Sequence, residues 1–161
     1  MDFQFDATAD GRRLKFLNVI DEHSRLCLAI RVGRRCKAKD VVTVLEELTS
    51  LYPAPAFIRS DNGPEFIAHA LRTWCKNSGT ATAYIEPGSP WQNGFAESFN
   101  SRFRDEFLNT ELFATVAEAQ GLANRWNRTS RCTRRRTGAP NTGWVAMPQQ
   151  FAFFPGPLST R

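Results

Sequence analysis

The chain has 161 residues, which suits one compact domain and leaves little room for a second. Its hydrophobic content of 42% fits a globular protein, and no apolar run approaches the roughly 20 residues of a membrane span. The net charge of +5 is concentrated in residues 125–136, which hold six arginines and no acid. Such a run can contact phosphates or form a solvated tail, and composition alone leaves both alternatives open.

The first third of the chain is predicted to form three strands. Residues 2–8 alternate Phe3 and Phe5 with polar neighbours, which is typical of a strand with one buried face. Residues 14–21 and 26–32 are two further apolar runs, and only short polar loops separate the three. We therefore expect an antiparallel meander.

Helices and strands alternate in the next third. Apolar side chains at helical spacing predict a helix over residues 38–52, and a short strand follows at 56–60. Pro64 suits the first position of a second helix, which Gly79 ends. Residues 80–85 form another candidate strand. Because helical crossovers join the later strands, each should run parallel to a neighbour, which gives a mixed sheet and an α/β class.

A third helix is expected over residues 91–108, and a fourth runs to about Asn127. In the third, phenylalanines recur every four residues and predict one buried stripe. These are Phe95, Phe99, Phe103 and Phe107. Beyond Asn127, proline and glycine interrupt the chain and no helical or strand period emerges.

Two acidic residues stand out by position. Asp61 ends a predicted strand, where ligands are commonly bound in α/β sheets, although Asp-Asn-Gly is also a favoured turn sequence. Glu97 lies off the centre of the phenylalanine stripe, and a solvated helix face is its alternative explanation. The side of the helix that carries Glu97 also carries Asn93, Asn100, Ser101 and Arg104.

Asp2 opens the first strand and is a third candidate. Its side chain should share a face with Gln4 and Asp6. An ordinary polar strand face would explain the pattern equally well. Asp6, Asp10 and Asp21 are rival acids that the pattern does not separate from Asp2.

Together these residues lie in motifs that closely resemble the catalytic core of insertion-sequence transposases. The motifs are MDF (1–3) followed by VIDEHSRLCLAI (19–30), SDNGPEF (60–66) and IEPGSPWQNGFAESFNSRFRDEFLN (85–109), with 35 residues between Asp61 and Glu97. That family belongs to the Asp-Asp-Glu class and is related to retroviral integrases. The resemblance covers about residues 1–127, and we assign 128–161 to an irregular, basic, proline- and glycine-rich tail.

The resemblance implies a ribonuclease H-like fold, with a five-stranded mixed sheet in the order 3-2-1-4-5 flanked by helices. It implies that Asp2, Asp61 and Glu97 are the catalytic and metal-binding residues. Arg104 matches a basic position, seven residues after the glutamate, that contacts the DNA end in this family. Asn93 and Asn100 are expected near the DNA.

The chemistry implied is DNA strand cleavage and strand transfer. Two divalent cations about 4 Å apart can activate the attacking oxygen and stabilise the leaving oxygen. Mg²⁺ and Mn²⁺ prefer oxygen ligands, so clustered carboxylates suit them. Without metal, three carboxylates in one place would repel each other, which makes such a cluster unusual as a structural feature.

Two departures from the family pattern shape the remaining expectations. The family carries a DNA-recognising helical region before this core, and the segment after Trp126 does not follow the family pattern. We therefore expect a truncated transposase core, a bacterial cytoplasmic protein that is nucleoid-associated when bound to DNA. Its partners would be transposon ends, target DNA and further copies of itself, with no membrane. The alternatives are an inactive DNA-binding remnant and a ribonuclease H-like nuclease.

Overall fold

The computed structural model describes residues 1–85 and 94–136, with side chains up to Ser130 in the last helix. Along the chain the elements are β1 (Asp2–Ala7), β2 (Arg13–Asp21), β3 (Leu26–Gly33), α1 (Ala38–Leu51), β4 (Phe57–Ser60), α2 (His69–Ser78), β5 (Ala81–Tyr84), α3 (Gly94–Phe103), a π-helical turn η2 (Arg104–Leu108) and α4 (Val116–Arg136). The fold is α/β, as the sequence predicts.

The described strands pair in two groups. β1, β2 and β3 form the predicted antiparallel meander, with Asp2 opposite Asn18, and β4 and β5 pair in parallel. The two groups meet at the start of β1, where the Met1 nitrogen donates to the Arg59 carbonyl of β4 at 2.7 Å. The ladders therefore make a three-stranded and a two-stranded sheet, where the resemblance implied one sheet of five strands.

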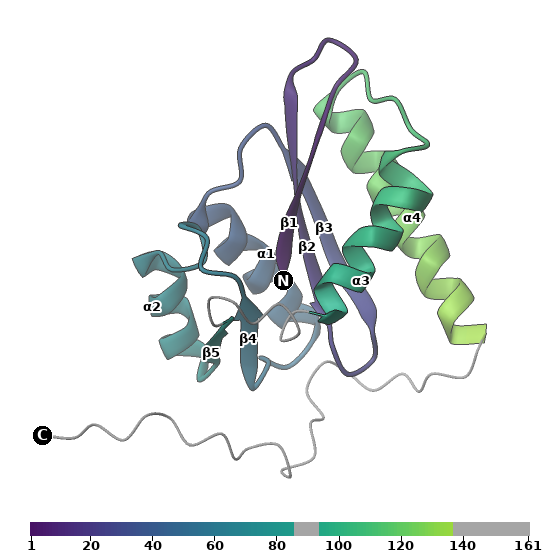
Figure 1. Cartoon of the computed structure of the whole chain (residues 1–161). Coiled ribbons are helices and arrows are strands. Elements are labelled where there is room, and N and C mark those ends of the chain that lie inside the picture. Colours follow the sequence, from purple (N-terminus) through teal and green to yellow (C-terminus); the bar gives the residue numbers. More distant parts are fainter. Residues whose placement is uncertain (86–93, 137–161) are drawn as a thin grey trace, which may run out of the picture.

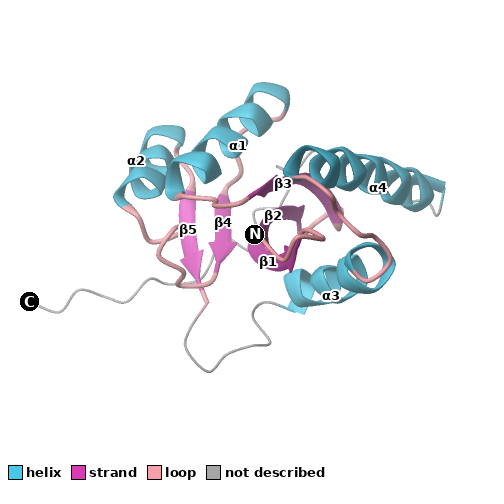
Figure 2. Cartoon of the chain, turned by 90° about the horizontal axis from the view of Figure 1, so that it is seen from above, coloured by secondary structure: helices cyan, strands magenta, loops and turns pink. Residues whose placement is uncertain are grey.

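Helices cover the meander on both sides, with α1 on one side and α3 and α4 on the other (Figure 1). The view from above shows α2 beside α1, over the β4–β5 pair (Figure 2). Because successive strand residues point to opposite faces, β2 supplies both cores. Leu17 and Val19 pack with Val44 and Leu45 of α1, whereas Phe16 packs under α3.

Three members of the predicted phenylalanine stripe are buried, and one is not. Phe99, Phe103 and Phe107 lie in the core beneath α3 and η2, and Phe103 is fully buried. Phe95 is 45% exposed, so the prediction that it belongs to the buried stripe was wrong. It sits in the first turn of α3, where the Arg25 guanidinium lies 5.3 Å from the centre of its ring.

Two helix boundaries differ from the sequence prediction. The helix expected to begin at Pro64 begins at His69, because residues 64–68 are taken up by turns that bury Phe66. The last helix continues past Asn127 to Arg136, so the backbone of the basic run is helical. Within residues 1–85 and 94–136, no helix combines the length and apolar character needed to span a bilayer.

Gly79 ends α2 in a left-handed conformation, with φ of 68°, as a helix C-terminus favours. We expect Gly79→Ala to lower the free energy of unfolding by about 1 kcal/mol, because alanine is strained at positive φ. Gly121→Ala is the matched control in the exposed interior of α4, where nothing lies within 4 Å of an added Cβ. It should raise stability by about 0.5–1 kcal/mol. Urea unfolding measures the stability of both variants. Equal effects would contradict the left-handed conformation of Gly79.

Candidate active site

Asp2 lies at the start of β1 and is half-buried. Its Oδ1 accepts a hydrogen bond from the Phe3 backbone nitrogen, and its Oδ2 accepts one from Asn100 Nδ2 of α3, both at 2.7 Å. Burial raises the pKa of Asp2, and the negative charge of Asp61 raises it further. The hydrogen bonds from Phe3 and Asn100 act in the opposite direction. The charge of Asp61 therefore acts on Asp2.

The start of β1 is firmly held. Met1 is buried among core side chains of β2, α1 and β4, and its nitrogen bonds to β4. The end of a chain frays unless it is tied into a sheet. Here the structure holds Asp2 between a backbone contact to β4 on one side and α3 on the other.

Asp61 follows β4 in a turn that fixes its side chain. Its Oδ1 accepts a hydrogen bond from the Gly63 backbone nitrogen at 3.1 Å. A Cβ added at Gly63 would lie 3.0 Å from this same oxygen, so a side chain there would displace the carboxylate. Asn62 ties the turn to the end of β5 by donating to the Ile85 carbonyl at 3.1 Å. Asp61 can therefore be both a turn residue and a functional residue, because the turn fixes the orientation of its exposed carboxylate.

The residues after the Asp61 turn dock it on β1 and β2. Phe66 is fully buried and stacks on Phe3, with ring centres 4.8 Å apart. Glu65 forms an ion pair with Lys15 of β2 at 2.6 Å, and the Lys15 ammonium lies 3.7 Å from the centre of the Phe3 ring. Because Phe3 directly follows Asp2, these contacts hold the Asp61 turn against the start of β1, where Asp2 lies.

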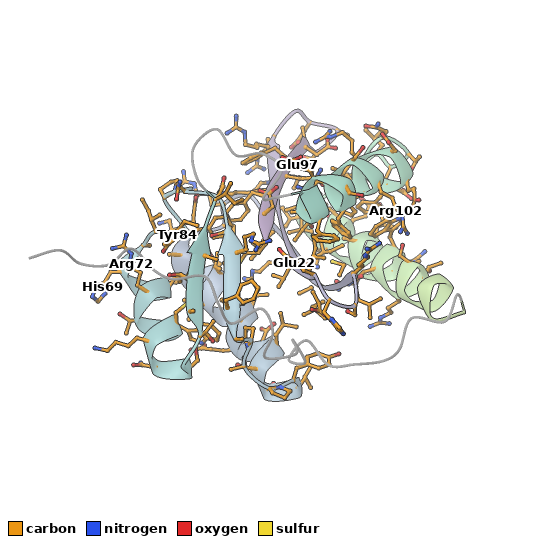
Figure 3. The ribbon with its side chains drawn as sticks, turned by 60° about the horizontal axis from the view of Figure 1, so that its bottom comes forward. Glu22, His69, Arg72, Tyr84, Glu97 and Arg102 are labelled. Carbon is orange, nitrogen blue, oxygen red and sulfur yellow. The ribbon has the colours of Figure 1, made fainter. Side chains whose placement is uncertain are left out.

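Glu97 lies in the exposed first turn of α3, on the part of that helix next to the β1–β3 sheet (Figure 3). Asn100, three residues on, is a neighbour on the same helix face and bonds Asp2. In the part of the chain that the structure describes, no three acidic, histidine or cysteine side chains converge as a metal-binding group. The start of β1 thus brings Asp2 near Asp61, and Glu97 lies one helical turn before Asn100, which bonds Asp2. Among the described residues the three carboxylates do not converge into one metal-binding cluster.

The other predicted contact residues have different surroundings. Arg104 is exposed and donates to the Phe5 carbonyl of β1 at 3.1 Å, so the face of α3 and η2 that carries Asn100 and Arg104 runs along β1. Asn93 lies outside the described residues. Asn100 has both ends of its side-chain amide engaged by protein groups, Asp2 and Asn18.

The rival acids of the first strands have local roles in the structure. Asp21 is buried and accepts hydrogen bonds from the backbone nitrogens of His23 and Ser24, which shapes the β2–β3 turn. Asp6 accepts from the Ala7 backbone nitrogen, and Asp10 accepts within the β1–β2 turn. These contacts separate Asp2 from its rivals, which the sequence pattern did not.

Sequence reasoning missed two polar side chains beneath Asp2. Gln4 is 8% exposed and Asn18 is fully buried, and both bond Asn100. The signal was present in the strand LKFLNVID, where Leu14, Phe16 and Asn18 share a face. A polar residue at the third position of an apolar series in a strand interior is unusual and needs partners.

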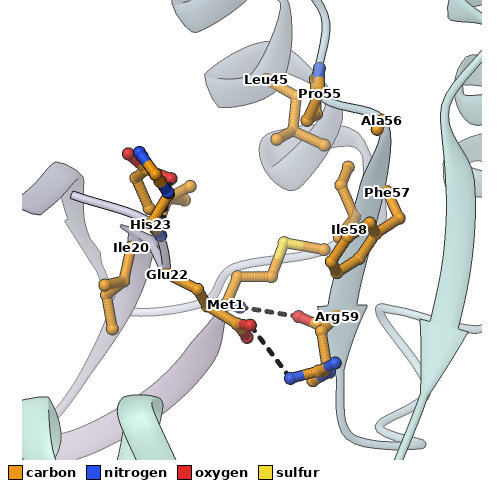
Figure 4. Close-up of a pocket in the computed structure, with 12 residues that line it drawn as sticks. Met1, Ile20, Glu22, His23, Leu45, Pro55, Ala56, Phe57, Ile58 and Arg59 are labelled. Atoms are coloured by element: carbon orange, nitrogen blue, oxygen red, sulfur yellow. Dashed lines mark hydrogen bonds and ion pairs between the residues drawn. The ribbon is translucent and has the colours of Figure 1, made fainter. Parts of the chain in front are cut away.

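A cavity of about 70 Å³ lies behind the two aspartates, between the end of β2, the start of β4 and α1. Met1 and Arg59 line it, and Arg59 pairs with Glu22 at 2.9 Å across it (Figure 4). The lining is mainly apolar, with Ile20 and Ile58 among its residues. Asp2 and Asp61 do not line this cavity, so the candidate site lies outside it, at the start of β1.

A family model described as an integrase core domain matches residues 1–90, more than half of the chain. The chain belongs to the integrase core domain family. A second integrase core domain model matches residues 78–129, so the two together span every candidate residue. This integrase core also has relatives in bacterial insertion elements.

One relative is the insertion element IS476 uncharacterized 39.2 kDa protein of Xanthomonas euvesicatoria, 41% identical over 128 residues, or 80% of this chain and 37% of that protein. Another is the insertion element IS407 uncharacterized 31.7 kDa protein of Burkholderia multivorans, 36% identical over 126 residues, or 78% of this chain and 46% of that protein. The chain therefore spans less than half the length of either relative.

Solved structures show the same fold at low sequence identity. The catalytic core domain of BIV integrase superposes with a TM-score of 0.53 at 18% identity, over 83% of this chain and 96% of that one. The HTLV-2 integrase catalytic core domain in complex with magnesium gives 0.53 at 15%, over 68% of each chain. An intasome of simian T-cell lymphotropic virus gives 0.55 at 16%, over 67% of this chain and 41% of that one.

Proposed function

We propose that this integrase core carries out metal-dependent DNA strand cleavage and strand transfer, with Asp2, Asp61 and Glu97 as its metal ligands. The observation that carries the proposal is the docking of Asp2 against the Asp61 turn, through the Phe3–Phe66 stack, and against the helix that bears Glu97, through Asn100. Membership of the integrase core domain family supports it, as do the insertion-element relatives.

The residues present fit divalent metal. Burial and the charge of Asp61 make ionisation of Asp2 unfavourable, and a cation between the two would remove that penalty. All the donors are carboxylate oxygens, which Mg²⁺ and Mn²⁺ prefer. The related HTLV-2 core was solved with magnesium. When bound, such ions would supply activation of the attacking oxygen and stabilisation of the leaving oxygen.

Neighbouring residues of the chain hold the proposed metal ligands in place. Asp61 is aimed by the Gly63 backbone nitrogen, and Asp2 is oriented by Phe3 and Asn100. Glu97 sits in the first turn of α3, on the same helix as Asn100. Because the proposed role of the three carboxylates is to hold metal ions, none of them needs to act as a proton-transferring base.

Further parts of the proposal concern DNA and assembly. Arg104 is exposed along β1 and would contact a phosphate of the DNA end. Asn93 would lie near the DNA, whereas Asn100 would act on Asp2 rather than on DNA. The proposed sheet order is 3-2-1-4-5, supported by the Met1–Arg59 hydrogen bond. We retain 1–127 as the core, although residues 128–136 of the proposed tail continue α4, and expect several copies to act on paired ends.

Metal titration followed by thermal melting tests the proposal. Millimolar Mn²⁺ or Mg²⁺ should raise the melting temperature, because a ligand of the native state stabilises it. Glu97→Gln and Asp61→Asn should abolish most of the rise. Glu46→Gln, an exposed glutamate of α1, is the matched control and should respond like the parent chain. A flat response in the parent chain would overturn the proposal in favour of an inactive remnant.

A direct assay completes the test. Incubation of supercoiled plasmid and linear DNA with the chain and Mn²⁺ should give nicked and joined products, and Glu97→Gln should reduce them by more than about a hundredfold. RNA–DNA hybrid serves as the competing substrate. Preferential cleavage of the hybrid would replace strand transfer by a ribonuclease H-like activity.

A further inference from the structure

Asn18 is a fully buried amide in the interior of β2, directly opposite Asp2 in the strand register. It interrupts the core series of Leu14 and Phe16 on the same face. Its Oδ1 has no hydrogen-bond partner among the described residues, which is an unfavourable situation for a buried polar atom. Core packing alone would favour an apolar side chain here, so the amide needs another explanation.

The hydrogen bonds around Asn18 have a direction that Asp2 sets. A carboxylate only accepts, so Asn100 must turn its Nδ2 toward Asp2 Oδ2, at 2.7 Å. This leaves Asn100 Oδ1 facing Asn18, whose Nδ2 donates to it at 3.0 Å. If the Asn18 amide were reversed, two acceptor oxygens would face each other.

Gln4 completes the network from β1. Its Oε1 accepts from Asn18 Nδ2 at 3.4 Å, and its Nε2 donates to the Asn100 backbone carbonyl at 2.7 Å. Gln4 therefore fixes the backbone of α3 while Asn18 fixes the Asn100 side chain. Both residues are more than nine-tenths buried, so the network lies inside the molecule and not on the DNA-facing surface.

We propose that Asn18 and Gln4 are positioning residues for the active site. Through Asn100 they aim one N–H donor at Asp2 and hold the first turns of α3, with Glu97, against β1. This inference rests on the proposed function only in taking Asp2 as a metal ligand. The hydrogen-bond network itself is independent of metal.

The first experiment uses the metal-free chain. Asn18→Leu removes the donor with little change in volume, so the Asn100 side-chain amide keeps its bond to Asp2 but loses the bond that holds its oxygen. Its NMR-detected proton exchange with water should become at least about fivefold faster, as expected for one net hydrogen bond. Asn127→Leu, a second buried asparagine with an unpartnered Oδ1, is the matched control in α4 and should leave this exchange unchanged. Equal exchange in Asn18→Leu and parent would overturn the proposal.

The second experiment measures Mn²⁺ affinity by calorimetry in a double-mutant cycle. Asn18→Leu should weaken binding about tenfold or more, and should have no further effect in an Asn100→Leu background. Additive losses would overturn the proposed route through Asn100. Should Asn18→Leu not fold, Asn18→Ala removes the same donor and is tested with the same two readouts. If the parent binds no Mn²⁺, the proposed function fails, while the exchange result still decides the network.

Discussion

We expect Phe103→Ala to lower the free energy of unfolding by about 3–5 kcal/mol, a large loss for a single substitution. Phe103 is fully buried, and its ring packs against Phe99, Phe107 and Trp126 at centroid distances of 5.9, 5.0 and 5.0 Å. It also meets Phe16 of β2 edge-on. Removing the ring leaves a cavity where α3, α4 and the sheet meet, which urea unfolding would detect.

Phe95→Ala is the matched control from the same helix. Its side chain is 45% exposed and meets Arg25 only at the surface, so its loss should cost less than about 1 kcal/mol. Phe103→Leu retains part of the packing and should fall between the two. If Phe95→Ala proved as damaging as Phe103→Ala, the position of α3 on the sheet would be wrong.

The second large effect is expected at Asp2. Because burial and the charge of Asp61 raise its pKa, ionised Asp2 destabilises the metal-free fold relative to the neutral form. Asp2→Asn should therefore raise the melting temperature at neutral pH while abolishing the rise caused by Mn²⁺. A gain in stability with a loss of ligand response is typical of a functional residue.

The stability difference between Asp2→Asn and the parent chain should depend on pH. A carboxyl with a raised folded-state pKa contributes stability that is fully present below its ordinary value of 3.8 and is lost as pH rises through the folded-state pKa. The advantage of Asp2→Asn over the parent should thus be absent below pH 3.8 and open as pH rises. Melting curves from about pH 3 to about pH 8 measure it. A constant difference across this range would contradict the assigned cause.

Much of the fold followed from the sequence because it depends on local periodicity. Alternation in residues 2–8, the apolar run in 14–21 and helical spacing in 38–52 predicted elements that the structure contains. Boundaries that depend on tertiary packing did not follow. The helix after Pro64 begins later than predicted because Phe66 is drawn into the core against Phe3, which no local pattern records.

The candidate site divides in the same way. The resemblance to transposase cores selected Asp61 and Glu97, because position alone left a favoured turn sequence and a solvated helix face as alternatives. The strand pattern did not separate Asp2 from Asp6, Asp10 and Asp21, and only the resemblance assigned Asp2. The structure adds the burial of Asp2 and its bond from Asn100, a residue 98 positions away in the chain.

For this protein, the sequence by itself determined which elements form and which carboxylates are candidates, because periodicity and turn chemistry act over a few residues. Only the tertiary structure decided which side chains meet. In the folded chain Asn18 and Gln4 are buried beneath the site, and Phe95 is exposed. The side-chain amide of Asn100 is hydrogen-bonded to Asp2 and Asn18. Hydrogen bonds between distant strands and helices set those outcomes, and they depend on geometry that no single segment contains.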